Sequence, residues 1–260
     1  PVLARWFFLK GTATTEIYTL SLRDARPIWR GRPDGAGPVS RGPRLILASA
    51  SPRRWDVMRQ IGLDPEVRPT DLDESYLEGE SPAEHVERLA RAKAEAVARS
   101  EPGAVVVGGD TVVVDSGRVL TKPVDEADAR RMLLALSGGT HEVLSGLALA
   151  GAHGTVSSVT RTVVRMRRYG EEDVAAYVAT GEPLDKAGGY GIQGLGAALV
   201  AGIEGDYYSV VGFPVGAFLD LLEQSGWRAA FGRLTPVAGG SPEGRRSCWP
   251  GLRAAGANPR

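Results

Sequence analysis

Residues 104–114 read Ala-Val-Val-Val-Gly-Gly-Asp-Thr-Val-Val-Val, two runs of valines separated by four small or polar residues. Its first run of valines is β-branched without interruption, which is typical of a strand buried on both faces. The second run continues as a strand as far as a turn at 115–117. We expect the buried strand to end at Asp110. Ligands bind at the carboxyl ends of strands in open α/β sheets, so this position makes Asp110 a candidate site residue.

Strand-like and helix-like segments alternate on both sides of this stretch. A Ser-Pro pair starts the first expected helix, and Ser81 with Glu84 has the spacing of a capping box at the start of the second. The expected strands span 45–48, 104–109, 111–114, 141–150 and 155–168, and the expected helices span 52–61, 81–97, 125–136, 171–179 and 214–225. We therefore predict an α/β fold with a mixed β-sheet flanked by helices, in two lobes with a central cleft.

Charge and cysteine content exclude several classes of protein. Lys plus Arg and Asp plus Glu both count 31 in the 260 residues, so no overall positive field attracts nucleic acid or a membrane surface. The single cysteine, Cys248, has no partner for an intramolecular disulfide or a thiolate metal site. No stretch approaches the ~18 apolar residues of a membrane span. These features predict a cytoplasmic protein that binds neither nucleic acid nor membranes.

Composition also divides the chain. Residues 1–43 and 229–260 are rich in Gly, Pro and Arg and have few periodic apolar positions. Such segments cannot bury enough apolar surface to offset the entropy that is lost on ordering. We expect 1–43 to be a disordered or artefactual extension, 44–228 to be one folded domain, and 229–260 to be a disordered tail.

The segment from Ser49 to Arg54 suits an anion. It joins an expected strand to an expected helix, where unpaired backbone N–H groups and the positive end of the helix dipole converge. Two serines and two arginines add donors that match phosphate oxygens. Ser-Pro is also a common helix start and arginines are usually solvated, so these residues alone leave both interpretations open.

Further polar residues lie outside this segment. The Asp110 carboxylate can activate water or hold a divalent cation, although turn-forming aspartates are common. Lys122, fixed by the following proline, can neutralise a phosphate only if the fold brings it near. Gln193 lies in a glycine-rich stretch, 181–196, and offers the donor and the acceptor that complement a uracil or thymine edge. His141 follows a turn and is expected to be structural.

Taken as an ordered series, the motifs resemble the Maf family over residues 44–227. They are Leu-Ile-Leu-Ala-Ser-Ala-Ser-Pro-Arg-Arg at 45–54, Asp-Leu-Asp-Glu at 71–74, Leu-Ala-Arg-Ala-Lys-Ala at 89–94, Gly-Asp-Thr-Val-Val at 109–113, Lys-Pro at 122–123, the stretch 137–143, Asp-Lys-Ala-Gly at 185–188 with Gln-Gly at 193–194, and Tyr-Tyr-Ser-Val-Val-Gly-Phe-Pro at 207–214. Many motifs in matching order make the resemblance specific. Gly109 and Ser209 depart from it, since Ala and Asn are usual there.

The resemblance implies a metal-assisted hydrolysis of a nucleoside triphosphate that releases pyrophosphate, in a fold related to inosine triphosphate pyrophosphatases. Asp110 would be the proton acceptor for the attacking water, with Mg²⁺, Mn²⁺ or Co²⁺ as cofactor. The residues expected to bind substrate are Ser49, Arg53, Glu74, Lys93, Thr111, Lys122 and Gln193. Arg53, Thr111 and Gln193 would set substrate choice, and the Gln193 stretch resembles the branch that acts on dTTP and UTP. Homodimers are frequent in the family.

Two other functions are alternatives to the enzyme. A nucleotide-binding regulator of cell division or septum formation would bind without significant turnover and would tolerate loss of the Asp110 carboxylate. An RNA-binding module needs a basic face with stacking aromatic residues, which the neutral net charge and 7% aromatic content disfavour. The enzyme hypothesis leads, with dTTP, UTP and modified pyrimidine nucleotides as candidate substrates.

Overall fold

The structure is a computed structural model that describes residues 42–229 and 231–237. Most of the two extensions expected from composition, Cys248 included, lies outside the described residues. The strands are β1 (Leu45–Leu47), β2 (Glu66–Val67), β3 (Val105–Asp115), β4 (Arg118–Leu120), β5 (Thr140–Gly151), β6 (Gly154–Met166), β7 (Val200–Glu204), β8 (Trp227–Ala229) and β9 (Leu234–Pro236). The helices are α1 (Pro52–Gln60), α2 (Pro82–Ala98), α3 (Glu126–Leu136), α4 (Glu171–Val178), α5 (Tyr207–Val211) and α6 (Val215–Gln224), with 3₁₀ helices η1 (Glu182–Asp185), η2 (Ala187–Gly189) and η3 (Gly194–Leu199). None of the helices in these described ranges is long and apolar enough to cross a membrane.

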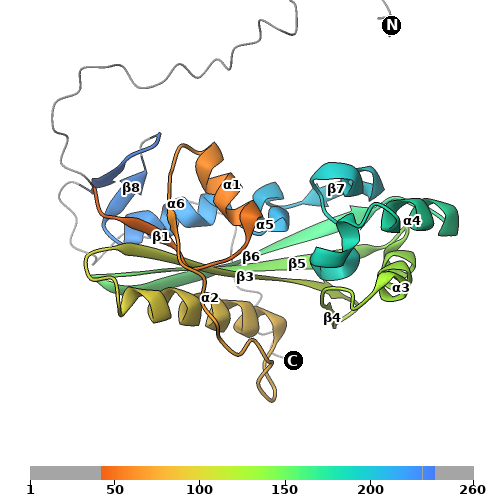
Figure 1. Cartoon of the computed structure of the whole chain (residues 1–260), viewed down its shortest axis with the longest axis horizontal. Coiled ribbons are helices and arrows are strands. Elements are labelled where there is room, and N and C mark those ends of the chain that lie inside the picture. The colour runs from red at the N-terminus through yellow and green to blue at the C-terminus, as the bar shows by residue number, and fades with distance from the viewer. Residues whose placement is uncertain (1–41, 230, 238–260) are drawn as a thin grey trace, which may run out of the picture. The chain divides into compact units, whose positions relative to one another are not determined.

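A seven-stranded sheet forms the centre of the fold (Figure 1). Its order is β2-β1-β3-β5-β6-β7, with β4 paired to β3 beside this path. Strand β1 is parallel to both β2 and β3, whereas the pairs β3–β5, β5–β6 and β6–β7 are antiparallel. The predicted mixed sheet is therefore confirmed.

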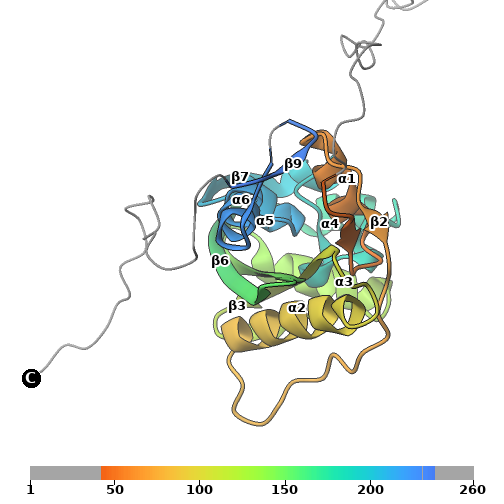
Figure 2. The same cartoon turned by 90° about the vertical axis from the view of Figure 1, so that its left-hand side faces the viewer.

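One face of the sheet is covered by α2, which runs along β3 and β5 (Figures 1 and 2). Two glycines allow this helix to lie against the strand backbone. A Cβ atom on Gly108 would be 2.1 Å from the carbonyl oxygen of Ala90, and one on Gly146 would be 2.3 Å from that of Val86. Because glycine has no side chain at these two positions, α2 can pack closely over the middle of β3 and β5.

The opposite face carries two apolar cores, one over each half of the long strands. Val143, Leu147 and Leu149 alternate along β5 and contribute to these cores from the same face. The first core gathers β1, α1 and α6 around Phe218, and the second gathers α3 and α4 around Leu133. Figure 1 shows α1 and α6 above one half of the strands and α3 and α4 at the other. The predicted lobes correspond to these two cores, and the cleft between them stays a prediction.

Asp110 lies in the middle of a strand and not at the end where it was predicted. The ladder between β3 and β5 continues without a break from Val106 to Val114. The two glycines before Asp110 do not end the strand, because each keeps its backbone N–H and C=O for the ladder. The strands expected at 104–109 and 111–114 are one strand.

The folded region extends beyond the boundary predicted at residue 228. Strands β8 and β9 form an antiparallel hairpin, and Leu234 of β9 packs against the first core. A Cβ atom on Gly42 would lie 2.5 Å from the carbonyl oxygen of Leu234, so this hairpin also contacts the chain just before β1.

Candidate active site

The candidate site lies where β3 has no neighbouring strand on one edge. Strand β5 covers the other edge from Val106 to Val114. On the open edge, β1 pairs only with Val105–Val107 and β4 only with Val113–Asp115. Among the described residues, no strand pairs with 108–112 on this edge. Side chains from both faces of the sheet can therefore reach the same opening.

Asp110 points from β3 toward α2, where it meets Lys93. The Nζ atom of Lys93 donates to Oδ1 of Asp110 at 2.9 Å and lies 2.6 Å from Oε1 of Glu74. Lys93 and Asp110 are 7% and 9% exposed, whereas Glu74 reaches them from an exposed segment between β2 and α2. One ammonium thus bridges two carboxylates, and this pairing offsets the cost of holding charges away from water.

On the opposite face, Arg54 of α1 lies beside Thr111. Its guanidinium nitrogens donate to the carbonyl oxygen of Gly212 at 2.9 Å, to Oγ of Ser49 at 3.0 Å and to Oγ1 of Thr111 at 3.2 Å. The Thr111 hydroxyl also shares a 2.9 Å hydrogen bond with the hydroxyl of Ser145. Arg54 is therefore fixed by its planar fork of donors to three separate segments of the chain.

Arg54 and the two carboxylates interact electrostatically across the strand edge. Burial lowers the pKa of the Arg54 guanidinium, and the negative charges of Asp110 and Glu74 oppose that shift. Arginine side chains are not deprotonated in proteins, so Arg54 contributes a positive charge to the opening. The residues that meet at the opening, which we call the edge cluster, are Ser49, Arg54, Glu74, Lys93, Asp110 and Thr111.

The start of α1 adds backbone donors to the edge cluster. Ser51 is the residue before the helix, and its side chain makes no capping hydrogen bond. Its own backbone N–H donates to Oγ of Ser49 at 3.2 Å. The first N–H groups of a helix have no partner within it and favour anions. The expected anion site at this corner is consistent with that arrangement.

Arg53 points toward the glycine-rich stretch that carries Gln193. Its NH1 atom lies 3.1 Å from Oδ2 of Asp185, with side-chain exposures of 34% and 66%. An exposed ion pair adds little to stability, so a ligand can displace Asp185 at low cost. Gln193 itself is exposed and directly precedes η3.

Lys122 does not join the edge cluster in this structure. It is exposed between β4 and α3, and in the described part of the chain no ion pair links it to Asp110 or Glu74. Strand β4 runs antiparallel to β3 with Leu120 opposite Val113, so the chain leaves β4 in the direction of the opening. Its role in binding stays a prediction.

The family resemblance points to Arg53 as the binding arginine, whereas Arg54 is the arginine that lies in the edge cluster. The structure places Arg54 on the inner face of α1 together with the buried residues Val57 and Met58. The helical period could have revealed this, because residues three and four apart share a helix face. Adjacent residues diverge by about 100°, so Arg53 faces elsewhere.

The two carboxylates of the edge cluster fit a metal ion. No three His, Cys, Asp or Glu side chains come together among the residues that the structure describes. Asp110 and Glu74 nevertheless converge on the same Lys93 ammonium, so their oxygens lie close enough to share a cation. Magnesium-like ions are often held by one or two carboxylates together with substrate phosphates and water. The donor set therefore suits a hard divalent cation that binds together with a triphosphate.

Comparison with known proteins gives the same answer over nearly the whole described region. Residues 44–225 match the family model described as Maf-like protein. A dTTP/UTP pyrophosphatase of Symbiobacterium thermophilum is 50% identical over 184 residues, covering 71% of this chain and 95% of that protein. One of Moorella thermoacetica is 52% identical over 181 residues, covering 69% and 93%.

A solved structure, the Ham1 protein of Staphylococcus aureus, is 16% identical with a TM-score of 0.35, over 49% of this chain and 74% of that chain. This likeness is too low to establish a common fold, so the relation to inosine triphosphate pyrophosphatases stays a prediction. The family match and the two sequence identities are sufficient by themselves: the chain belongs to the Maf family.

Proposed function

We propose that this protein hydrolyses dTTP and UTP to the nucleoside monophosphate and pyrophosphate. Relatives named dTTP/UTP pyrophosphatase are 50% and 52% identical to it over almost their whole length. The observation that carries the proposal is the Lys93 ammonium between the carboxylates of Asp110 and Glu74, at an open strand edge beside Arg54. A carboxylate that acts as a base, a second carboxylate that can bind a metal ion, and nearby cations are groups that phosphate hydrolysis uses.

In this proposal Asp110 is the general base. An oxygen of water bonds to the α-phosphorus, and the bond from that phosphorus to the oxygen bridging the β-phosphorus breaks. Pyrophosphate leaves with the electron pair of the broken bond, and the water proton moves to Asp110. Lys93 donates to Oδ1 of that carboxylate, which leaves Oδ2 to accept the proton.

The cations around the opening stabilise the charge that develops on the phosphate oxygens. Arg54 and the N-terminus of α1 approach from one face of β3, and Lys93 approaches from the other. Donors that are already oriented lower the barrier without having to reorganise. A divalent cation held at the Glu74 carboxylate would, when bound, neutralise phosphate oxygens and polarise the reacting centre.

Substrate choice is assigned to the residues nearest the glycine-rich stretch. The Gln193 amide has one donor group and one acceptor, as a uracil or thymine edge requires. Arg53 is held near this stretch by Asp185 and can turn to a phosphate or a base. The Thr111 hydroxyl is engaged by Arg54 and Ser145, so we assign it to holding Arg54 rather than to contacting the base.

A nucleotide panel tests the proposal. The purified full chain is incubated with dTTP, UTP, CTP, ATP and GTP in Mg²⁺, Mn²⁺ or Co²⁺, and pyrophosphate is measured, with Gln193→Glu as the matched variant. We expect turnover of dTTP and UTP and a selective loss of both in the variant. Cleavage of guanine nucleotides alone would refute the role of Gln193, and binding without pyrophosphate would point to a regulator instead.

The proposal also covers the setting of the reaction. We infer a cytoplasmic enzyme that works on a diffusing nucleotide. The chain has no net charge, so we also infer that it has no nucleic-acid or membrane partner. A homodimer is proposed because dimers are frequent in the family, and sedimentation of the purified chain measures it.

A further inference from the structure

We propose that Arg88 and Glu80 are positioning residues, which hold the segment that carries Glu74 so that its carboxylate reaches Lys93 and Asp110. This inference rests on the proposed function and assigns roles to two residues outside the edge cluster. Among the described residues neither side chain is hydrogen-bonded to Asp110, and Arg88 interacts with that carboxylate only through its charge. The role proposed for both residues is therefore exerted through Glu74.

The segment that carries Glu74 has little structure of its own. Residues 71–79 form no helix or strand and are almost all exposed, and the Glu74 side chain is 57% exposed. Segments with few buried contacts open at low free energy. A separate contact is therefore needed to keep Glu74 Oε1 2.6 Å from Nζ of Lys93.

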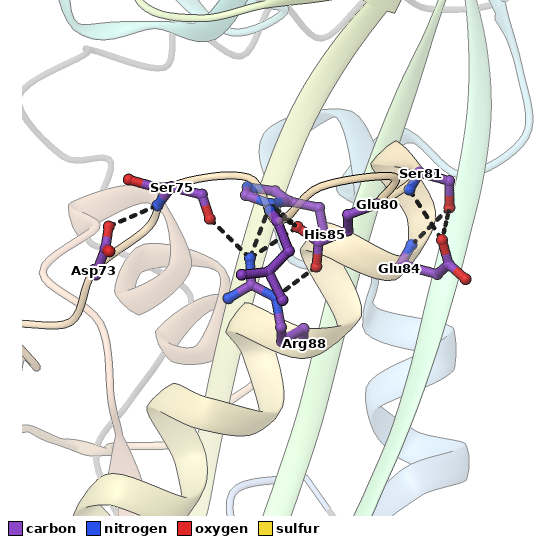
Figure 3. Close-up of polar contacts among 8 residues, drawn as sticks. Asp73, Ser75, Glu80, Ser81, Glu84, His85 and Arg88 are labelled. Carbon is purple, nitrogen blue, oxygen red and sulfur yellow. Dashed lines mark hydrogen bonds and ion pairs between the residues drawn. The ribbon is translucent and has the colours of Figure 1, made fainter.

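Arg88 supplies that contact (Figure 3). Its NH2 atom donates to the carbonyl oxygen of Ser75, directly after Glu74, at 2.9 Å. The same guanidinium donates to both carboxylate oxygens of Glu80, at 2.5 Å and 2.8 Å, as a bidentate pair. Arg88 lies on α2, the helix that also carries Lys93. The backbone next to Glu74 and the Glu74 side chain are thus both bound to residues of α2.

Glu80 keeps the Arg88 guanidinium in this orientation. Its side chain is 6% exposed, and it also accepts the backbone N–H of Leu77 at 3.1 Å and contacts Nδ1 of His85 at 2.9 Å. The hydrogen bond from Arg88, followed by those from Leu77 and His85, holds the pKa of Glu80 well below its usual range against the effect of burial. The Tyr76 ring stacks on the His85 ring with the ring centroids 3.5 Å apart, and this contact also fixes the segment to α2.

A positioning role differs from a purely structural one in a measurable way. An arginine that only stabilises the fold weakens the enzyme whether or not Glu74 is present. An arginine that acts through Glu74 loses its effect once the Glu74 carboxylate has been removed. Residues coupled in this way give non-additive double-mutant cycles, whereas independent residues give additive ones.

The test is a cycle of Arg88→Ala, Glu74→Ala and the double variant in the full chain, scored as kcat/KM for pyrophosphate release from dTTP. We expect Arg88→Ala to lower kcat/KM at least about tenfold, but less than about twofold when Glu74 is already Ala. Arg88→Lys keeps the positive charge but cannot form the bidentate pair, so its kcat/KM should lie between those of the wild type and Arg88→Ala. Additive losses would overturn the inference.

Arg91→Ala is the matched control, because Arg91 lies on the same helix but donates to Ser157 Oγ at 3.0 Å and not to the Glu74 segment. Its effect on kcat/KM should be independent of Glu74. Amide hydrogen exchange at residues 73–78 provides a readout that needs no activity. Arg88→Ala should accelerate it and Arg91→Ala should not, and unchanged exchange in Arg88→Ala would overturn the inference. A wild-type protein that released no pyrophosphate would refute the proposed function instead.

Discussion

Lys93 donates a 2.9 Å hydrogen bond to Asp110 across the face of β3, and both side chains are almost fully buried. The two residues come from different elements, α2 and β3, and meet because glycines let the helix lie against the strand. Glu74 completes the cluster on the exposed side. Each charge is therefore stabilised by the others, and the site depends on all three.

Loss of one partner should cost stability as well as activity. Lys93→Met leaves the buried Asp110 carboxylate and the exposed Glu74 carboxylate without their cation. We expect the free energy of unfolding to fall by about 3 kcal/mol, mainly because of Asp110. The double variant Lys93→Met with Asp110→Asn should recover part of that loss, because the unpaired charge is gone. Urea denaturation measures both, and a single variant as stable as the wild type would contradict the buried-pair description.

The two glycines before Asp110 should differ in how far they tolerate alanine. A Cβ on Gly108 meets the Ala90 carbonyl oxygen at 2.1 Å, and backbone cannot move aside cheaply, so we expect a loss of more than about 3 kcal/mol. A Cβ on Gly109 meets side-chain atoms, Leu147 Cδ2 at 3.1 Å and Arg54 Nε at 3.2 Å, and shifts of a few tenths of an ångström relieve both contacts. Gly109→Ala should therefore change the melting temperature little, and equal effects of the two substitutions would be inconsistent with the packing of α2.

The elements themselves could be predicted because their signals are local. The capping box expected at the start of α2 is present, since Oγ of Ser81 accepts the Glu84 N–H at 3.3 Å and Oε2 of Glu84 accepts the Ser81 N–H at 2.9 Å (Figure 3). The long hairpin of β5 and β6 followed from alternation along both strands. Short edge strands such as β2 and β9 were missed, because two or three residues carry no period.

The geometry of the site could not be predicted in the same way. The opening at 108–112 depends on where β1 and β4 stop, which is decided by tertiary packing and not by the sequence of β3. The pairing of Arg88 with the Ser75 carbonyl joins residues thirteen positions apart through a segment without a periodic pattern. The sequence suggests Asp110 as a candidate residue, which stays a prediction, whereas its surroundings are products of the fold.

Arg54 should tolerate replacement by lysine less well than Arg53. Three different nitrogens of Arg54 donate to Gly212, Ser49 and Thr111, and the single ammonium nitrogen of lysine cannot take all three places. Arg54→Lys should therefore lower the stability of the fold, and it should lower kcat/KM by more than about tenfold. Arg53→Lys breaks only an exposed pair and should change stability by less than about 1 kcal/mol. Denaturation and steady-state kinetics on both variants make the comparison, and the reverse order of stability loss would refute the placement of Arg54.

His141 should make the protein less stable in weak acid. It is buried, with Nε2 2.7 Å from the Tyr190 hydroxyl, and burial lowers its pKa to about 4. The unfolded chain, with a histidine pKa of about 6.5, binds a proton that the folded protein does not bind. The free energy of unfolding should therefore fall by up to about 3 kcal/mol as the pH drops from about 7 to about 4, with no further contribution below that.

The variant His141→Gln should remove this part of the pH dependence while leaving a donor for Tyr190. Replacing His153, which is exposed in the turn between β5 and β6, by Gln controls for the loss of a histidine. Unfolding free energies at several pH values provide the measurement. An unchanged slope in His141→Gln would show that another group is responsible.

The proposed mechanism requires the Asp110 carboxylate as the base in pyrophosphate release. Asp110→Asn keeps the shape of the side chain and a hydrogen-bonding oxygen near Lys93, so the fold and nucleotide binding should survive. We predict that pyrophosphate release from dTTP and UTP falls by a factor of about 10² to 10⁴ while dTTP still binds to the variant. Release of pyrophosphate by Asp110→Asn at the wild-type rate would contradict the role of Asp110 as the base.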